Sequence, residues 1–221
     1  MSNHAVAEST ASEFEVHWAR GRFNALFFGL MGPYLNRNLR RHKQRVFDQL
    51  PNRVVEIGSG VGANLRYMPA NSTLVAVEPN PHMHRRLQAA ARRKGVRLEL
   101  HDQVGERIDL ADHSVDAVIS SLVLCSVTDP AHVLAEIRRV LRPGGHYSFV
   151  EHVAAPAGTP TRMLQRMLRR PWAWTFEGCS CERDLESAIR AAGFTAVAIE
   201  PYRLHTPFIP FNTHIAGTAH A

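Results

Sequence analysis

A glycine-rich turn directly after an acidic strand end is the segment of this chain with the clearest chemistry. Alternating glycines permit a tight turn and a close backbone approach that a Cβ atom would obstruct. After β-branched residues they predict a strand, a loop and the start of a helix. Such a turn is typical of a nucleotide-like cofactor site, for which the sequence offers Glu56, Gly58, Ser59, Gly60, Gly62 and Asn64.

Two classes of cofactor fit this turn. Gly58, Gly60 and Ala63 satisfy the dinucleotide fingerprint G-x-G-x-x-A, and Glu78 stands where a ribose-binding carboxylate is expected. A pyrophosphate here would be repelled by Glu56, whereas the ammonium and sulfonium groups of S-adenosylmethionine would be attracted to it. We therefore favour S-adenosylmethionine, with a dinucleotide site and an ordinary glycine turn as the alternatives.

Polar or closely packing residues also follow the later strands. Ligands of open parallel sheets bind beyond the carboxyl ends of the strands, near the point where strand order reverses, so we expect these residues to meet. Glu78 would accept hydrogen bonds from a ribose diol, and Met83 would lie against the adenine. The remaining expected cofactor contacts are Pro79, Asn80, Val104, Gly105, Glu106, Ser121, Leu122 and Val123.

Expected strands and helices alternate along the chain, which predicts an α/β fold with parallel strands in one sheet. The residues from Leu141 to His146 indicate a turn between the helix expected at 130–141 and the fifth strand. Helices are expected at 62–68, 81–94, 130–141 and 182–192. Strands are expected at Arg53–Ile57, Thr73–Glu78, Val96–His101, Val115–Ser121, Tyr147–His152, Thr195–Tyr202 and Thr213–His220.

Length and composition predict one domain over residues 13–221 after a disordered tail at 1–12, since 221 residues with 45% hydrophobic side chains suffice for a sizeable core. Within it we expect a helical cover at 13–50 and an inserted cap at 153–180.

The chain has no apolar run of transmembrane length. The shorter run from Phe23 to Leu35 is expected to cover a pocket, with peripheral membrane contact as the alternative.

Charge and cysteine content limit the possible partners. The formal net charge is +6, but the arginines lie on expected helices as solvated faces, so we expect no nucleic-acid binding. Three cysteines without a signal peptide indicate a reducing compartment, and we expect the protein to be cytoplasmic. Cys179-x-Cys181 lacks a second pair at zinc-finger spacing, so no metal site is predicted.

These segments are similar to those of class I S-adenosylmethionine-dependent methyltransferases, whose signature pairs an E-x-G-x-G-x-G turn with a late L-R-P-G-G turn. More narrowly, the chain resembles the methyltransferase-like seven group. The resemblance implies a Rossmann-like class I methyltransferase fold, with a seven-stranded, mostly parallel sheet, helices on both faces and an antiparallel last strand. The segments that carry it are Ser121–Val127, Val140–Gly145, Glu151–Ala155 and Phe176–Cys179.

The resemblance also implies an activity, because members of that group are alkyl thiol S-methyltransferases. A small, rather apolar thiol would then be the acceptor, and S-adenosyl-L-homocysteine the second product. The vertebrate members begin with a hydrophobic membrane-anchoring helix, whereas this chain begins with a polar tail. Ser59 stands where the family usually has Cys, and Glu78 where it has Asp; both changes preserve the expected role.

A thiol acceptor must ionise, and at pH 7 only a few per cent of a free thiol with a pKa near ~8.5 is thiolate. His152, at the end of the fifth strand, is the candidate for a base or orienting group, with a core histidine bonded to backbone as the alternative. Two other functions stay open. One is methyl transfer to nitrogen, oxygen or carbon of a metabolite, quinone or lipid, and the other is a cofactor- or nucleic-acid-binding protein.

Overall fold

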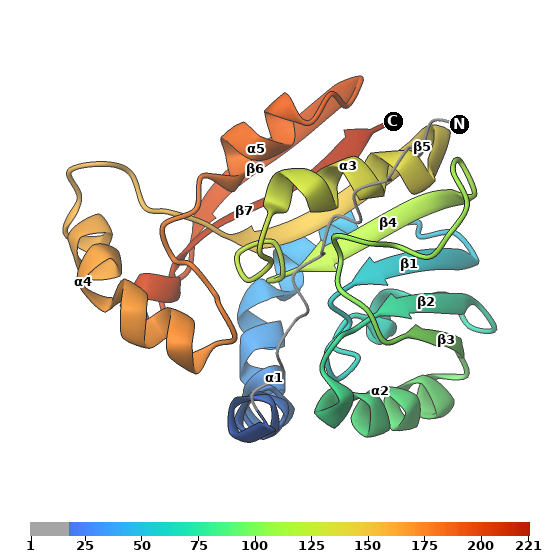
Figure 1. Cartoon of the computed structure of the whole chain (residues 1–221), viewed down its shortest axis with the longest axis horizontal. Helices are drawn as coiled ribbons and strands as arrows, with labels where there is room; N and C mark the ends of the chain where they lie inside the picture. The colour runs from blue at the N-terminus through green and yellow to red at the C-terminus, as the bar shows by residue number, and fades with distance from the viewer. Residues whose placement is uncertain (1–17) are drawn as a thin grey trace, which may run out of the picture.

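The computed structural model describes residues 18–221, and seven strands of this part form one sheet in the order β3-β2-β1-β4-β5-β7-β6 (Figure 1). Neighbouring strands from β3 to β5 run parallel, whereas β7 is antiparallel to both β5 and β6. This confirms the expected fold, and strand order reverses between β1 and β4. The strands are β1 Arg53–Ile57, β2 Thr73–Val77, β3 Arg97–His101, β4 Val115–Ser121, β5 Leu141–His152, β6 Ala196–Arg203 and β7 Thr213–His220.

Helices cover both faces of the sheet. Helices α3 and α5 lie on one face and α1 and α2 on the other, whereas α4 stands beside the sheet next to η2 (Figure 1). No helix of residues 18–221 combines the length and apolarity needed to cross a membrane. The helices are α1 Trp18–Val46, α2 Pro81–Lys94, α3 Pro130–Val140, α4 Pro160–Thr175 and α5 Leu185–Ala191, with short 3₁₀ turns η1 Leu65–Tyr67 and η2 Ile209–Phe211.

Helices α2 and α3 both begin at proline with an acceptor side chain just before it. The Asn80 side chain accepts a hydrogen bond from the His82 amide at 3.0 Å at the start of α2. Asp129 accepts from the Ala131 amide at 2.9 Å at the start of α3. Proline at the first helical position lacks the amide hydrogen that would otherwise be unpaired, so both starts follow from local sequence.

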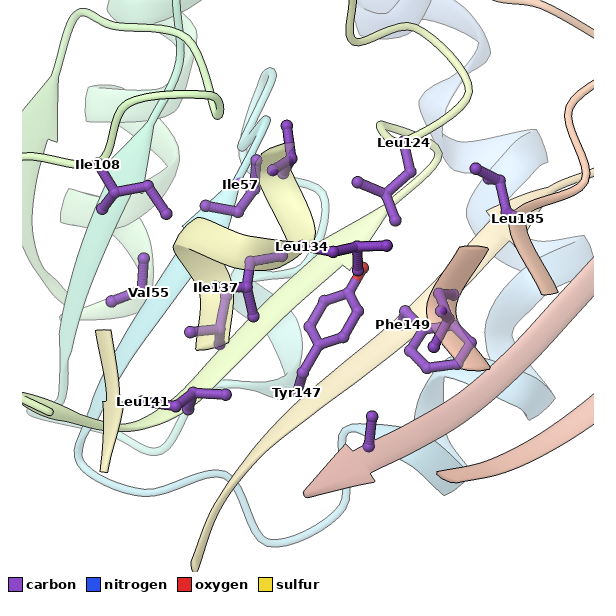
Figure 2. Close-up of a cluster of buried hydrophobic side chains, with 14 of the residues drawn as sticks. Val55, Ile57, Ile108, Leu124, Leu134, Ile137, Leu141, Tyr147, Phe149 and Leu185 are labelled. Atoms are coloured by element: carbon purple, nitrogen blue, oxygen red, sulfur yellow. The ribbon is translucent and has the colours of Figure 1, made fainter. Parts of the chain in front are cut away.

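An apolar layer on each face of the sheet anchors these elements. On the face of α3 and α5, Tyr147 and Phe149 of β5 pack with Leu134 and Ile137 of α3 and Leu185 of α5 (Figure 2). All five side chains are essentially inaccessible to solvent. The opposite layer joins α1 and α2 to the sheet through residues that include Leu39, Leu87, Leu74 and Val54.

The segment expected to form a helix at 62–68 is instead a series of turns with the short η1 inside it. Gly62 has a φ of +85°, in the left-handed region, so a right-handed helix cannot begin there. Pro69 then follows too closely for a helix to develop. A Cβ atom at Gly62 would lie 2.7 Å from Leu65 Cδ1 and 3.1 Å from Leu87 Cδ1, so this glycine lets the loop pack on α2.

Other boundaries also differ from expectation. Strand β5 begins at Leu141, because Leu141 already pairs with Val115 of β4. The next pair is Ala117 with His146, so residues 142–145 of the expected turn form an irregularity inside the strand. The N-terminal cover is one helix that contains Pro33. Residues 1–12, the expected tail, and the first residues of the expected cover lie outside the described part. The expected cap at 153–180 contains α4.

We expect Ile137→Ala to lower the free energy of unfolding by about 2–5 kcal/mol, because it removes fully buried atoms between α3 and the sheet. Ala135→Ser, at an exposed position of the same helix, should change it by less than about 0.5 kcal/mol. Urea denaturation of both variants measures the difference. Equal effects would contradict the proposed role of this layer.

Candidate functional site

A cavity of about 510 Å³ lies beyond the carboxyl ends of β1, β2 and β4, at the point where strand order reverses. Helices α1 and α4 complete its wall from the outside of the sheet. All the expected cofactor contacts except Gly62 line it. They are Glu56, Gly58, Ser59, Gly60, Asn64, Glu78, Pro79, Asn80, Met83, Val104, Gly105, Glu106, Ser121, Leu122 and Val123.

The glycine loop lies closely against the loop after β4. Gly58 has a φ of +64°, and a Cβ atom there would lie 2.4 Å from Val123 Cγ2 and 2.8 Å from Cγ1. Because Val123 is branched at its own Cβ, its side chain has little freedom to move aside. Only glycine therefore allows both the backbone turn and the close approach of the two loops that form the cavity floor.

Glu78 holds the glycine loop in place. One carboxylate oxygen accepts a hydrogen bond from the Gly60 amide at 2.7 Å, and the other accepts from the Asn80 amide at 2.9 Å. Burial raises the pKa of Glu78, and these two amide bonds oppose the shift. Each oxygen retains a second lone pair, so the carboxylate can still accept bonds from a ribose diol.

A buried polar network joins α1 to the same loop. The Lys43 ammonium of α1 donates to Asn64 Oδ1 at 2.8 Å and to Asn36 Oδ1 at 3.2 Å. The Asn64 amide in turn donates to Glu56 Oε1 at 2.6 Å. Glu56 Oε2 is buried without a hydrogen-bond partner among the described residues. An ammonium group in the cavity would satisfy this oxygen, as expected for the amino acid end of S-adenosylmethionine.

The charges of this network are costly to bury. Burial raises the pKa of Glu56 to about 7, against the opposing effects of Asn64 and Lys43. It lowers the pKa of Lys43 to about 8, against the opposing effect of Glu56. The cavity therefore contains a carboxylate that is poorly stabilised until a cation reaches it, which fits a cationic cofactor.

Glu151 of β5 holds the loop after β4 through hydrogen bonds to its backbone. Its carboxylate accepts from the Val123 and Leu124 amides at 2.9 and 3.1 Å and from the Ser120 hydroxyl at 2.5 Å. Burial raises its pKa to about 7. Leu122 between these residues has a φ of +63°, which is unfavourable for a branched side chain. The Glu151 bonds stabilise this strained turn, and so place Ser121, Leu122 and Val123 on the cavity wall.

Glu106 connects the loop after β3 to the start of α3. Its carboxylate accepts from the Thr128 amide at 2.8 Å and the Asp129 amide at 3.2 Å. Val104, Gly105 and Glu106 all line the cavity, where cofactor contacts are expected. The expected side-chain contacts of Glu106 with a ligand stay a prediction, because its observed role is to join two loops.

The cap side of the cavity is aromatic. Phe27 of α1 packs edge-on against Phe176, with ring centroids 5.3 Å apart, and Phe176 packs against Trp172 of α4 at 4.7 Å. Phe28, Phe208 and Phe211 also line the cavity. On the opposite side of α1, Leu30 is 70% exposed. The run from Phe23 to Leu35 thus contributes to the cover of the cavity, as expected.

His152 does not line the cavity, contrary to the expectation that it faces the acceptor. Its side chain is fully buried, and Nε2 lies 2.8 Å from the Pro210 carbonyl oxygen. Nδ1 lies 3.8 Å from Cys179 Sγ, and Cys179 itself lines the cavity. The histidine is therefore one layer behind the wall, because the cap returns to the end of β5 and places Cys179 in front of it.

Sequence reasoning did not select several cavity residues. Lys43 lies in a run of arginines that suggested a solvated face, although Asn36, Leu39 and Lys43 recur at helical spacing and form one buried stripe. Glu177 was noted only within a family motif; its Oε1 accepts from the Asn80 side chain at 3.0 Å, and burial raises its pKa to about 7. Cys179 belongs to the same family motif and to the Cys179-x-Cys181 pair, and neither pattern predicts its contact with His152.

Comparisons with known proteins agree with this geometry. A family model described as "Methyltransferase domain" matches residues 55–149. Human thiol S-methyltransferase TMT1B is 33% identical over 201 residues, which cover 86% of this chain and 82% of that protein. Human thiol S-methyltransferase TMT1A is 34% identical over 169 residues, covering 75% and 69%. A solved SAM-dependent methyltransferase of Thermotoga maritima has a TM-score of 0.63 at 17% identity, covering 91% of this chain and 99% of that chain.

We expect Gly58→Ala to weaken S-adenosylmethionine binding at least tenfold, because the added Cβ would displace Val123 and open the loop. Gly95→Ala is a matched control, since Gly95 also has a positive φ, +71°, but no neighbour within 4 Å of an added Cβ. It should cost about 1 kcal/mol of stability and leave affinity unchanged. Calorimetric titration with S-adenosylmethionine measures the affinity of both variants. Equal affinities would contradict the assignment of the glycine loop as part of the cofactor site.

We also expect Glu56→Gln to stabilise the cofactor-free protein while weakening cofactor binding. Because the folded pKa of Glu56 is raised from 4.5 to about 7, the unfolded chain loses this proton first, and stability falls as pH rises through that range. Glutamine cannot ionise, so the variant does not lose this stability. We expect it to be more stable than the parent by roughly 1–3 kcal/mol at pH 7.5 and by little at pH 4.5. Denaturation at both pH values measures the effect.

Glu99→Gln supplies a control of opposite sign. The hydrogen bond from Arg53 lowers the pKa of exposed Glu99, so its replacement should slightly reduce stability at pH 7.5. An increase in stability from both substitutions, or from neither, would contradict the assigned environment of Glu56.

Proposed function

Since the chain belongs to the class I S-adenosylmethionine-dependent methyltransferases, in the family that includes human TMT1A and TMT1B, we propose that it methylates the sulfur of a small, apolar thiol. The observation that carries this proposal is one cavity with two different walls. The wall around Glu56 and Glu78 is polar and suits the cofactor. The wall around Phe27, Trp172 and Phe176 is aromatic and suits an uncharged, apolar acceptor.

The names of the relatives support sulfur as the acceptor atom. The two human proteins are described as thiol S-methyltransferases, and this chain spans more than two thirds of each. A neutral thiol loses little hydration when it enters an aromatic pocket, whereas an alcohol or ammonium group of the same size loses more. An apolar wall therefore favours a thiol over its oxygen and nitrogen counterparts.

When bound, S-adenosylmethionine supplies an electrophilic methyl group on a sulfonium centre. The Glu56 carboxylate and the glycine loop would fix the amino acid end, and Glu78 the ribose, so the methyl group points to one place in the cavity. The aromatic wall would hold the acceptor in line with it and exclude water. Positioning and desolvation of this kind supply much of the rate of a methyl transfer.

An amine acceptor is the second candidate, and one residue favours it. Glu177 lines the cavity, and its ionised carboxylate could hold a protonated amine. The hydrogen bond from Asn80 already engages one of its oxygens, and its raised pKa of about 7 leaves it partly neutral near that pH. We therefore rank the amine below the thiol.

An acceptor panel tests the proposal. Matched alkyl thiols, amines and alcohols of equal chain length would be incubated with the protein and S-adenosylmethionine, and methylated products identified by mass spectrometry. We expect product from the thiols, with KM falling by up to about fourfold for each added methylene until the apolar wall is filled. Turnover of the amine or alcohol alone would overturn the choice of sulfur.

A cavity variant makes the test specific. We expect Phe27→Ala to raise KM for the longer thiols about tenfold without changing S-adenosylmethionine affinity, because it removes a ring from the aromatic wall only. Leu30→Ala, on the exposed side of the same helix, should change neither quantity. A loss of cofactor affinity in Phe27→Ala would place this wall at the cofactor instead.

A further inference from the structure

Two cysteines and a histidine converge at the edge of the cavity, next to Trp172 of the aromatic wall. Cys125 Sγ lies 3.4 Å from Cys179 Sγ, which lies 3.8 Å from His152 Nδ1. All three potential ligand atoms lie within 4.8 Å of one another. Cys125 follows β4, His152 ends β5, and Cys179 lies in the loop after α4, so three separate segments bring them together.

These separations match those of a zinc site. With Zn–S near 2.3 Å and Zn–N near 2.0–2.1 Å, tetrahedral geometry places two sulfurs about 3.8 Å apart and a sulfur and a nitrogen about 3.6 Å apart. The Cys125–Cys179 and Cys179–His152 separations of 3.4 and 3.8 Å differ from these values by only a few tenths of an ångström. The Cys125 sulfur and the His152 nitrogen, which lie within 4.8 Å, would have to approach by at most about 1.2 Å. Two sulfurs and one imidazole nitrogen are also the donor set that selects thiophilic metals over magnesium or calcium.

The surroundings of His152 prepare one nitrogen to bind a cation. A carbonyl oxygen only accepts hydrogen bonds, so the 2.8 Å contact with Pro210 requires a proton on His152 Nε2. In the neutral ring, Nδ1 then carries a free lone pair directed toward Cys179. Histidine ligands typically donate their other N–H to a carbonyl or carboxylate in this way. The Trp172 indole N–H also donates to Cys179 Sγ at 3.4 Å, a bond that favours the thiolate.

The cluster is open on one side only. Cys125 and Cys179 line the cavity, whereas His152 is fully buried. A cation among them would have three protein ligands and one remaining position toward the cavity. Catalytic zinc sites share this arrangement, in which a water or a substrate takes the fourth position.

We propose that Cys125, Cys179 and His152 bind a Zn²⁺ ion whose fourth position takes the sulfur of the acceptor. Binding of Zn²⁺ releases the two cysteine protons to solvent, and binding of the acceptor thiol releases a third. The coordinated acceptor sulfur forms a bond to the methyl carbon as the bond from that carbon to the cofactor sulfur breaks. The neutral thioether binds zinc weakly and leaves with S-adenosyl-L-homocysteine.

The part of this inference that concerns the acceptor rests on the proposed thiol specificity, whereas the metal site does not. A zinc ion would explain how a thiol is ionised in an apolar cavity without a histidine in contact with it, because coordination to a metal deprotonates a thiol outright. It also gives His152 a positioning role from behind the wall.

The first experiment measures the metal alone. The full chain would be dialysed with Zn²⁺ and then against metal-free buffer, and zinc counted by mass spectrometry; we expect about one ion per chain. Cys125→Ser and Cys179→Ser should each lose it. Cys181→Ser is the matched control, since Cys181 is equally buried but bonds to the Gln165 carbonyl, and it should keep the ion.

A second readout needs no variant. Bound Zn²⁺ should slow alkylation of Cys125 and Cys179, which line the cavity, and leave the labelling of buried Cys181 unchanged in the native protein. Replacement by Co²⁺ should give thiolate-to-metal charge-transfer absorption, and an alkyl thiol should shift the ligand-field bands as it takes the fourth position. Unchanged bands with saturating thiol would overturn the acceptor role while leaving the metal site.

The outcomes separate this inference from the proposed function. Full thiol turnover in protein shown to be metal-free would overturn the zinc inference and retain the thiol function. Zinc bound at one equivalent without turnover of any thiol would retain the site and reject the function. A Cys125–Cys179 disulfide formed by mild oxidation, with no zinc bound after reduction, would replace the metal site with a redox pair.

Discussion

Lys43 reaches from α1 to the glycine loop, and its buried contact with Asn64 fixes how the outer wall of the cavity sits on the sheet. An ammonium group cannot be buried without acceptors. Asn36 of α1 itself supplies one, so the helix must dock where Asn64, which is bonded to Glu56, supplies the other. This requirement sets the position of Phe27 and Phe28, which lie about four turns earlier on the helix. The contact of Lys43 therefore positions the aromatic wall relative to the glycine loop.

The sequence predicted the sheet and most residues that line the cavity around the glycine loop, because both depend on local signals. Proline after Asn80 and Asp129 marks the starts of two helices, and apolar strands end at polar loops that must meet at the switch point. The resemblance supplied the antiparallel strand order, which periodicity alone does not. The segment from Gly62 to Met68 was misassigned because a glycine after a strand usually opens a helix, whereas here it adopts a left-handed conformation to pack on α2.

The acceptor side was predicted less well, since it depends on contacts between distant segments. Cys125 and Cys179 are 54 residues apart, and no spacing pattern joins them to each other or to His152. Likewise, the buried side of α1 is hidden in a run of basic residues, where Lys43 looks like its arginine neighbours. These positions become recognisable only when the cap and α1 are placed against the sheet.

Asn80 joins the two sides of the cavity. It caps α2, donates its backbone amide to Glu78 at the cofactor cradle, and donates its side chain to Gly21 of α1 and to Glu177 beside α4. The same small residue thus joins the ribose side of the cavity to both parts of its cover. The cofactor side and the acceptor side of the cavity therefore share one structural support, and a change at Asn80 would disturb both at once.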